Sequence, residues 1–411
     1  MSNLREPSPG PGKTAAGSYL WLISFLVFGA GLAQSFAALG IPVLYPFIQE
    51  EFGLSRTQVG FITSSYAIGI GTSVVLAGWL TDTFGVKRMI IFSLVGIAAL
   101  TICFPLVNSF LIILVLAIFI GIASSPVYPA SARAIMDWLP VRVRAVAMGV
   151  TAAGFPFGGT LSAALLPALA LAIGWRMAAA VTGLLVLSVV LVFKVMYRDV
   201  PRSGSATRRL SLATVKTMLK NRSLVVTIVW GAAFLGLYYV VLTYFMLFLI
   251  QKLGLSAITA GGLLATAQFC SIISRVMWGA ASDFIFRGRR VAVLAITGFL
   301  TVAWMLGISL MPVTVPIPLL YLMAVVIGVS TLSFHAVLTA LVGEQSEPEQ
   351  VGMTIGVASM GNHVCMMVMP PLFGFLVDAS GSYSLAWGAA AGLALAGTSA
   401  LLVFCRDPQR R

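Results

Sequence analysis

Long hydrophobic segments, separated by short polar ones, run along almost the whole chain. Stretches such as 180–196 and 383–405 do not alternate in polarity, so they fit membrane-spanning helices of about 20 residues and not the strands of a barrel. Twelve spans are predicted, near 19–45, 56–80, 87–107, 110–136, 143–172, 176–197, 223–250, 258–282, 291–311, 317–343, 351–377 and 384–405. This pattern predicts an all-α integral membrane protein.

A polar turn between the second and third spans recurs between the eighth and ninth. The first copy reads Gly78-Trp79-Leu80-Thr81-Asp82-Thr83-Phe84-Gly85-Val86-Lys87-Arg88. The second, degenerate copy reads Gly279-Ala280-Ala281-Ser282-Asp283 and then Gly288-Arg289-Arg290. The two leading glycines lie 201 residues apart, and so do the two aspartates. A turn repeated once at half the chain length indicates two similar membrane halves, the build of a secondary transporter.

Composition and charge fix the class and the orientation. The chain is 59% hydrophobic and 9% charged, whereas soluble domains carry about 25% charged residues. Twenty of the 25 Lys and Arg residues fall on the side of the two termini, and three, Arg56, Arg176 and Lys252, fall on the other. The positive-inside rule therefore predicts that both termini are cytoplasmic, in the cytoplasmic membrane. The net charge of +13 follows from this topology, and no nucleic-acid partner is expected.

The same pattern divides the chain into five parts: a disordered cytoplasmic tail (1–18), a six-helix bundle (19–197), a basic linker (198–222), a second six-helix bundle (223–405) and a short cytoplasmic tail (406–411). In the linker, Leu212, Val215 and Leu219 share a helical face, which fits either an interfacial helix on anionic lipid or a solvated basic segment. The four cysteines lack metal-ligand spacing, so no metal and no cofactor are expected.

The repeated turn, G-x-L-x-D-x-x-G-x-[RK]-[RK], resembles the cytoplasmic signature of the major facilitator superfamily. The resemblance covers the whole chain and implies two pseudo-symmetric six-helix bundles. It also implies that the turn is a conformational latch, in which Asp82 meets the neighbouring half and Lys87 and Arg88 pair with acids at nearby helix ends. Asp137 is the expected partner of Arg88 or Arg144. The candidate gate residues are Gly78, Asp82, Gly85, Lys87, Arg88, Arg133, Asp137, Arg144, Asp283, Arg289 and Arg290.

A second block resembles family members that carry organic anions, including anion:cation symporters and monocarboxylate porters. It comprises Tyr128-Pro129-Ala130, Asp137-Trp138-Leu139-Pro140, the segment from Arg144 to Gly149, and Gly174-Trp175-Arg176. Gly154-Phe155-Pro156-Phe157-Gly158-Gly159 is similar to the fifth-helix motif of drug/proton antiporters, but its proline stands one place late. Small residues here also permit close helix contact.

The predicted membrane interior contains cationic or potentially cationic residues but no carboxylate. All twelve acids lie at helix ends, in loops or in tails, whereas Arg275, His335 and His363 lie within spans. An arginine at mid-depth costs at least about 2.5 kcal/mol without a counter-charge, which a bound anion supplies. The residue 201 positions before Arg275 is Val74, so the repeated scaffold does not require a cation there.

Resemblance adds to this interpretation of Arg275. Oxalate/formate exchangers and monocarboxylate porters carry an eighth-helix arginine for the substrate carboxylate. This chain departs from them at Ser271, where the porters place an aspartate, and at Asn362-His363, where the oxalate exchanger has a lysine. A structural ion pair or a carbonyl contact is the alternative role for Arg275. For Arg133, a gate role with Asp137 or backbone carbonyls stands beside substrate contact.

The candidate substrate-binding residues are Arg275, Gln268, His335, Asn362, His363, Tyr128, Tyr239 and Gln34. The leading hypothesis is a monomeric secondary transporter, in contact with membrane lipids, that moves a small organic anion such as a monocarboxylate by alternating access. Each histidine is either a neutral hydrogen-bonding residue or the carrier of a coupled proton. A drug/proton antiporter is the alternative, although it needs an interior acid. No nucleophile–base pair indicates an enzyme.

Overall fold

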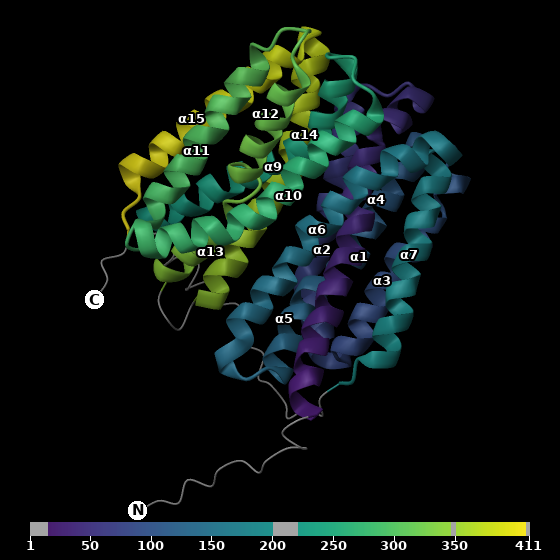
Figure 1. Ribbon diagram of the computed structural model, residues 1–411, viewed down its shortest axis with the longest axis vertical. Helices are drawn as coiled ribbons and strands as arrows, with labels where there is room; N and C mark the ends of the chain where they lie inside the picture. The colour runs from purple at the N-terminus through teal and green to yellow at the C-terminus, as the bar shows by residue number, and fades with distance from the viewer. Residues whose placement is uncertain (1–14, 200–220, 347–350, 408–411) are drawn as a thin grey trace, which may run out of the picture.

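Helices make up all the regular secondary structure in the part of the chain that the computed structural model describes, residues 15–199, 221–346 and 351–407. The first half contains α1 (Ala15–Phe52), α2 (Arg56–Phe84), α3 (Val86–Ile102), a short 3-10 turn (Phe104–Leu106), α4 (Phe110–Ser124), α5 (Val127–Trp138), α6 (Val141–Ile173) and α7 (Trp175–Met196). The second contains α9 (Arg222–Gln251), α10 (Ala257–Ala280), a π-helical turn (Ala281–Ile285), α11 (Arg290–Ser309), α12 (Ile317–Val329), α13 (His335–Glu344), α14 (Val351–Ser380) and α15 (Tyr383–Phe404). Figure 1 shows the two bundles side by side, and the predicted fold class is confirmed.

Two predicted spans are broken helices. The fourth span, 110–136, is α4 followed by α5, and the tenth, 317–343, is α12 followed by α13. Among the described residues, eleven helical segments are long and apolar enough to cross a membrane, and α12, with 13 residues, is too short to do so alone. Only α12 and α13 together complete the twelfth crossing, so the expectation of one continuous helix over 317–343 is wrong at residues 330–334.

Several sequence predictions fall on residues outside this description. The structure does not describe residues 1–14, 200–220 and 408–411. The predicted tails and the predicted linker helix around Leu212 therefore stay predictions. The helix of the first span begins at Ala15, within the segment predicted as a tail (1–18).

The bundle has two sides, which we name by the chain ends. The terminal side is where α1 begins and α15 ends, and it holds both copies of the repeated turn. The far side holds the turns between α1 and α2 and between α14 and α15. Gly85, with φ of 98°, ends α2 and starts α3 in a single residue. A side chain is strained at such a φ, which explains the glycine in the turn.

Close packing of small residues joins the helices within and between the halves. A Cβ at Gly158 of α6 would overlap Ser35 and the Leu32 carbonyl of α1, so glycine lets these two helices approach. Between the halves, α2 packs against α14, α6 packs against α10, and α1 packs against α9. The contacts between the halves thus run from α2 and α14, through α1 and α9, to α6 and α10.

Candidate functional site

Breaks in the fourth and tenth spans leave backbone carbonyls without helical partners. Pro126 cannot donate a backbone hydrogen bond, and the Ser124 carbonyl near it accepts one from Gln34 Nε2 of α1 at 3.1 Å. In the second half, Arg275 of α10 donates to the Leu332 carbonyl, from Nη2 at 3.1 Å and Nε at 3.4 Å. Trp278 Nε1 donates to the Val329 carbonyl at 2.7 Å. Irregular backbone inside a membrane protein is satisfied by such neighbours.

Arg275 keeps an uncompensated charge at this break. The Leu332 carbonyl accepts hydrogen bonds but carries no net charge, and the other polar partner is the Tyr238 side chain of α9. Among the described residues, no carboxylate forms an ion pair with Arg275. A guanidinium has five N–H donors, so donors remain for a ligand. The carbonyl contact that the sequence offered as an alternative role for Arg275 is therefore present. It leaves the guanidinium without a counter-charge.

Two further groups that can contact an anion lie beside Arg275. His335 is the first residue of α13, its side chain is exposed, and it lies within electrostatic reach of the guanidinium. In the part of the chain that the structure describes, no side chain caps the N-terminus of α13. The first N–H groups of a helix and its dipole favour an anion. A guanidinium, an imidazole and an uncapped helix start are thus gathered at one break in the helix.

The first half contributes neutral polar groups to the same region. Tyr66 of α2 interacts with Gln34 and Ser124, and also lies near Tyr238 and Tyr239. The rings of Tyr238 and Tyr239 are 5.3 Å apart, between their centroids. Among the predicted residues, the structure therefore brings Gln34 and Tyr239 into one cluster with Arg275 and His335. Sequence reasoning missed Tyr66, although Ser64-Ser65-Tyr66 is a polar run within an apolar span.

In the described part of the chain, no hydrogen bond joins the other four predicted binding residues to this cluster. His363 Nδ1 is 2.6 Å from the Ser359 carbonyl of its own helix, and the residue packs against α2. Asn362 is buried, and Tyr128 on α5 is 74% exposed. Gln268 lies two helical turns from Arg275 on α10, buried against α6 of the other half.

Each half holds a cluster of two acids and one arginine on the terminal side. In the first half, Arg133 lies 2.9 Å from Asp137 and 3.3 Å from Asp82. The expected pairing of Asp137 with Arg88 or Arg144 is wrong, because Arg133 is one helical turn before Asp137 and reaches it directly. Arg144 instead donates to the Leu139 carbonyl at 2.8 Å and to the Met136 carbonyl at 3.0 Å, at the end of α5.

The corresponding cluster of the second half uses a different arginine. Arg290 Nη2 lies 3.1 Å from Asp283 and 2.7 Å from Glu344 at the end of α13. Arg290 belongs to the repeated turn, whereas Arg133 belongs to α5. Glu344 was not among the predicted gate residues, because its role depends on the packing of α13 against α11.

A second repeated pair was also missed. Asp199 Oδ1 accepts a hydrogen bond from the backbone N of Lys87 at 3.0 Å, and Asp407 Oδ1 accepts one from the backbone N of Val291 at 2.9 Å. Each aspartate follows the last helix of its half and caps the helix after the repeated turn. The signal was present as Arg198-Asp199 and Arg406-Asp407, 208 residues apart.

On the far side, one carboxylate joins the halves. Asp378 of α14 accepts hydrogen bonds from the backbone N of Arg56 at 3.1 Å, the backbone N of Thr57 at 2.8 Å and the Thr57 hydroxyl at 2.7 Å. It thereby adds a cap from the second half to the N-terminus of α2. In the described part of the chain, the hydrogen bonds that cross between the halves join residues 49–64 to residues 243–251, 367 and 378. This state is closed on the far side.

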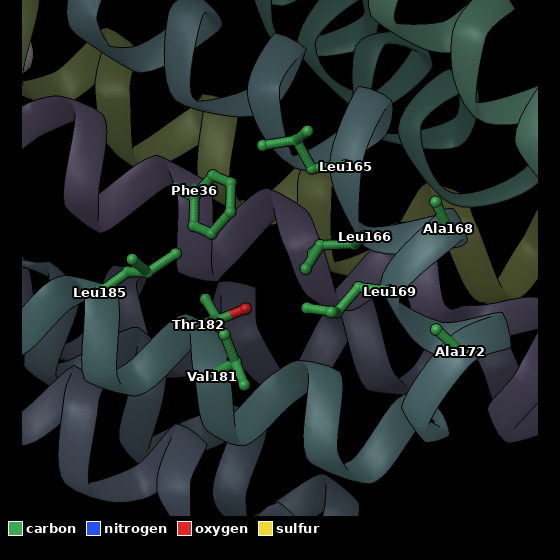
Figure 2. A pocket seen from close by; sticks show the side chains of 9 residues that line it. All are labelled: Phe36, Leu165, Leu166, Ala168, Leu169, Ala172, Val181, Thr182 and Leu185. Atoms are coloured by element: carbon green, nitrogen blue, oxygen red, sulfur yellow. The ribbon is translucent and has the colours of Figure 1, made fainter.

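The pocket of about 440 Å³ in Figure 2 is a different feature. It lies between α1, α6 and α7 of the first half, and its lining is apolar except for the hydroxyl of Thr182. That hydroxyl already donates to the Ala178 carbonyl at 3.0 Å. Such a pocket suits a hydrocarbon chain, so we place the candidate site at Arg275 instead.

Comparisons with known proteins agree with the fold. The family model described as Major Facilitator Superfamily matches residues 23–311 and 245–411. The chain is 28% identical over 376 residues to the probable sulfoacetate transporter SauU of Cupriavidus necator, with 84% of each protein covered. It is 24% identical over 406 residues to the hexuronate transporter of Bacillus subtilis, with 93% of this chain and 94% of the relative covered. A crystal structure of the nucleoside transporter NupG shares the fold, with a TM-score of 0.79, 13% identity and coverage of 93% and 100%.

Proposed function

The chain belongs to the major facilitator superfamily, and from this premise we propose that it moves a small organic anion across the cytoplasmic membrane by alternating access. It is a membrane transporter and not an enzyme. The single observation that carries the proposal is that Arg275 has no counter-ion among the described residues and lies beside the uncapped start of α13. Two relatives named for sulfoacetate and hexuronate, both organic anions, support the same class of substrate.

In this proposal the substrate carboxylate binds the free donors of Arg275, and Tyr238 completes the contact. The neutral side chains of Gln34 and Tyr66, which belong to the first half, contact the rest of the substrate. One cation in the site fits one anionic group, so we propose a monocarboxylate or a similar carboxylic acid. A ligand held by both halves favours the state in which they close around it.

We further propose that the terminal side is cytoplasmic, because the excess of Lys and Arg lies there. The state closed at Asp378 is then the one that faces the cytoplasm. We assign a coupled proton to His335, because His363 already contacts a carbonyl of its own helix. A drug/proton antiporter finds no support, since the described carboxylates lie at helix ends and not near Arg275.

Uptake into proteoliposomes tests the role of Arg275. Arg275→Gln keeps a donor for the Leu332 carbonyl but removes the charge, and we expect organic-anion uptake to fall about 10- to 100-fold. Arg275→Lys keeps the positive charge but loses the planar, two-pronged set of N–H donors, so uptake should fall less in this variant. Trp278→Phe is the matched control, because it removes a neighbouring carbonyl contact at constant charge. Undiminished uptake in both Arg275 variants would contradict the site.

The proton proposal has its own test in the same vesicles. An imposed pH gradient, acidic outside, should accelerate uptake by the wild type and have less effect on His335→Gln. His363→Gln is the control and should respond as the wild type does. Uptake that ignores the gradient in the wild type would contradict proton coupling and favour exchange.

A further inference from the structure

Gln268 is buried where the two halves meet, and its amide has no partner. The residue is 1% exposed, and neither Nε2 nor Oε1 makes a hydrogen bond in the described part of the chain. Its Oε1 lies against Gly159 of α6, where a Cβ would overlap it. The amide thus projects from the second half into a gap that only glycine leaves in the first.

An unpartnered buried amide disfavours the state in which it occurs, by about 1–3 kcal/mol for each unpaired group in general. A methionine would fill the same space without this penalty. The far-side-closed state therefore gives no reason for glutamine at position 268. The reason has to lie in the state where α6 and α10 separate, because only then does the amide meet polar atoms outside the protein.

The position of Gln268 along α10 indicates what those atoms belong to. Gln268 and Arg275 lie on one face of α10, seven residues apart, which is about 10 Å along a helix axis. An extended acid of about six carbons, with a hydrogen bond of about 2.9 Å at each end, spans this separation. The amide offers both a donor and an acceptor, which suits hydroxyl groups and gives no advantage to a second anionic group.

We propose that Gln268 is a specificity-determining contact for the hydroxyl groups of the substrate, available only when the far ends of α6 and α10 separate. This inference rests on the proposed function, since Arg275 must hold the carboxylate at the other end. It narrows the substrate to hydroxylated monocarboxylic acids of about six carbons. The closed state excludes the contact, so the substrate would lose it as the far side closes.

Binding to the full-length protein in detergent tests this proposal, with gluconate and hexanoate as probes of equal length that differ in hydroxyl groups. The wild type should bind gluconate more tightly. Gln268→Met should reduce the ratio of the two affinities about threefold to tenfold. A ratio is used because hexanoate lacks the hydroxyl groups, so effects of Gln268→Met on binding of the carboxylate or of the carbon chain cancel. Gln268→Met removes only unpaired polar atoms, so the variant should fold.

Thr266→Val is the matched control, because the Thr266 hydroxyl already donates to the Gly262 carbonyl of its own helix at 2.9 Å. This variant should keep the wild-type ratio. If Gln268→Met changes the affinities for both acids equally, or changes neither, the inference about Gln268 is wrong while the proposed function stands. If the wild type binds neither acid, the proposed function fails as well.

Discussion

The two sides of the membrane bundle use the same kinds of residue in opposite ways. On the far side, Asp378 crosses from one half to the N-terminus of α2 in the other. On the terminal side, Arg133 and Arg290 each bind two acids of their own half. Polar contacts thus join the halves at one side and stabilise each half separately at the other. The difference indicates which contacts must break when the transporter changes state and which can persist.

Breaking the far-side contact should have the largest effect. Asp378→Ala removes three accepted hydrogen bonds between the halves, and we expect the far-side-open population to rise about 30-fold, or about 2 kcal/mol. Spin labels at Glu50 and Ala379, introduced on a cysteine-free background, would report the far-side distance. Asp378→Asn keeps an acceptor and should shift the population less. Unchanged distances in Asp378→Ala would show that this carboxylate does not hold the halves together.

Loss of either terminal-side cluster should lower the free energy of unfolding more than it shifts the balance between the two transport states. The two clusters should differ in the size of this loss. The Arg290 side chain is 12% exposed and that of Arg133 is 33% exposed, so solvent screens the ion pairs of Arg290 less than those of Arg133. Arg290→Met should cost about 2 kcal/mol and Arg133→Met about 1 kcal/mol, because each leaves two facing carboxylates. Thermal unfolding in detergent measures both. Equal or reversed losses would contradict the ranking by burial.

The repeated aspartate caps should give the smallest effects. Asp199→Ala and Asp407→Ala each remove one acceptor at a helix start, and each should cost about 0.5–1 kcal/mol. The two caps belong to different halves, so the double variant should show the sum of the single losses. Thermal unfolding again measures this. A loss in the double variant well beyond the sum would mean that the caps are coupled across the interface.

The sequence predicted the architecture because membrane spans are set by hydrophobicity alone. It did not predict the break of the tenth span, since residues 330–334 read Ser-Thr-Leu-Ser-Phe, with no proline or glycine. The bond of Arg133 to Asp137 follows from their spacing of four residues, but its bond to Asp82 needs the packing of α2 against α5. The role of Asp378 could not be predicted either, because its partners stand more than 300 residues earlier in the chain and meet it only through packing.

Recognition of a negative charge by Arg275 is the central claim, and comparing a carboxylic acid with its neutral amide tests it most directly. Binding of gluconate and gluconamide would be measured for the wild type and for Arg275→Gln. We predict that the wild type prefers the acid about 10- to 100-fold and that Arg275→Gln shows almost no preference. A variant that still prefers the acid as strongly as the wild type would contradict the account.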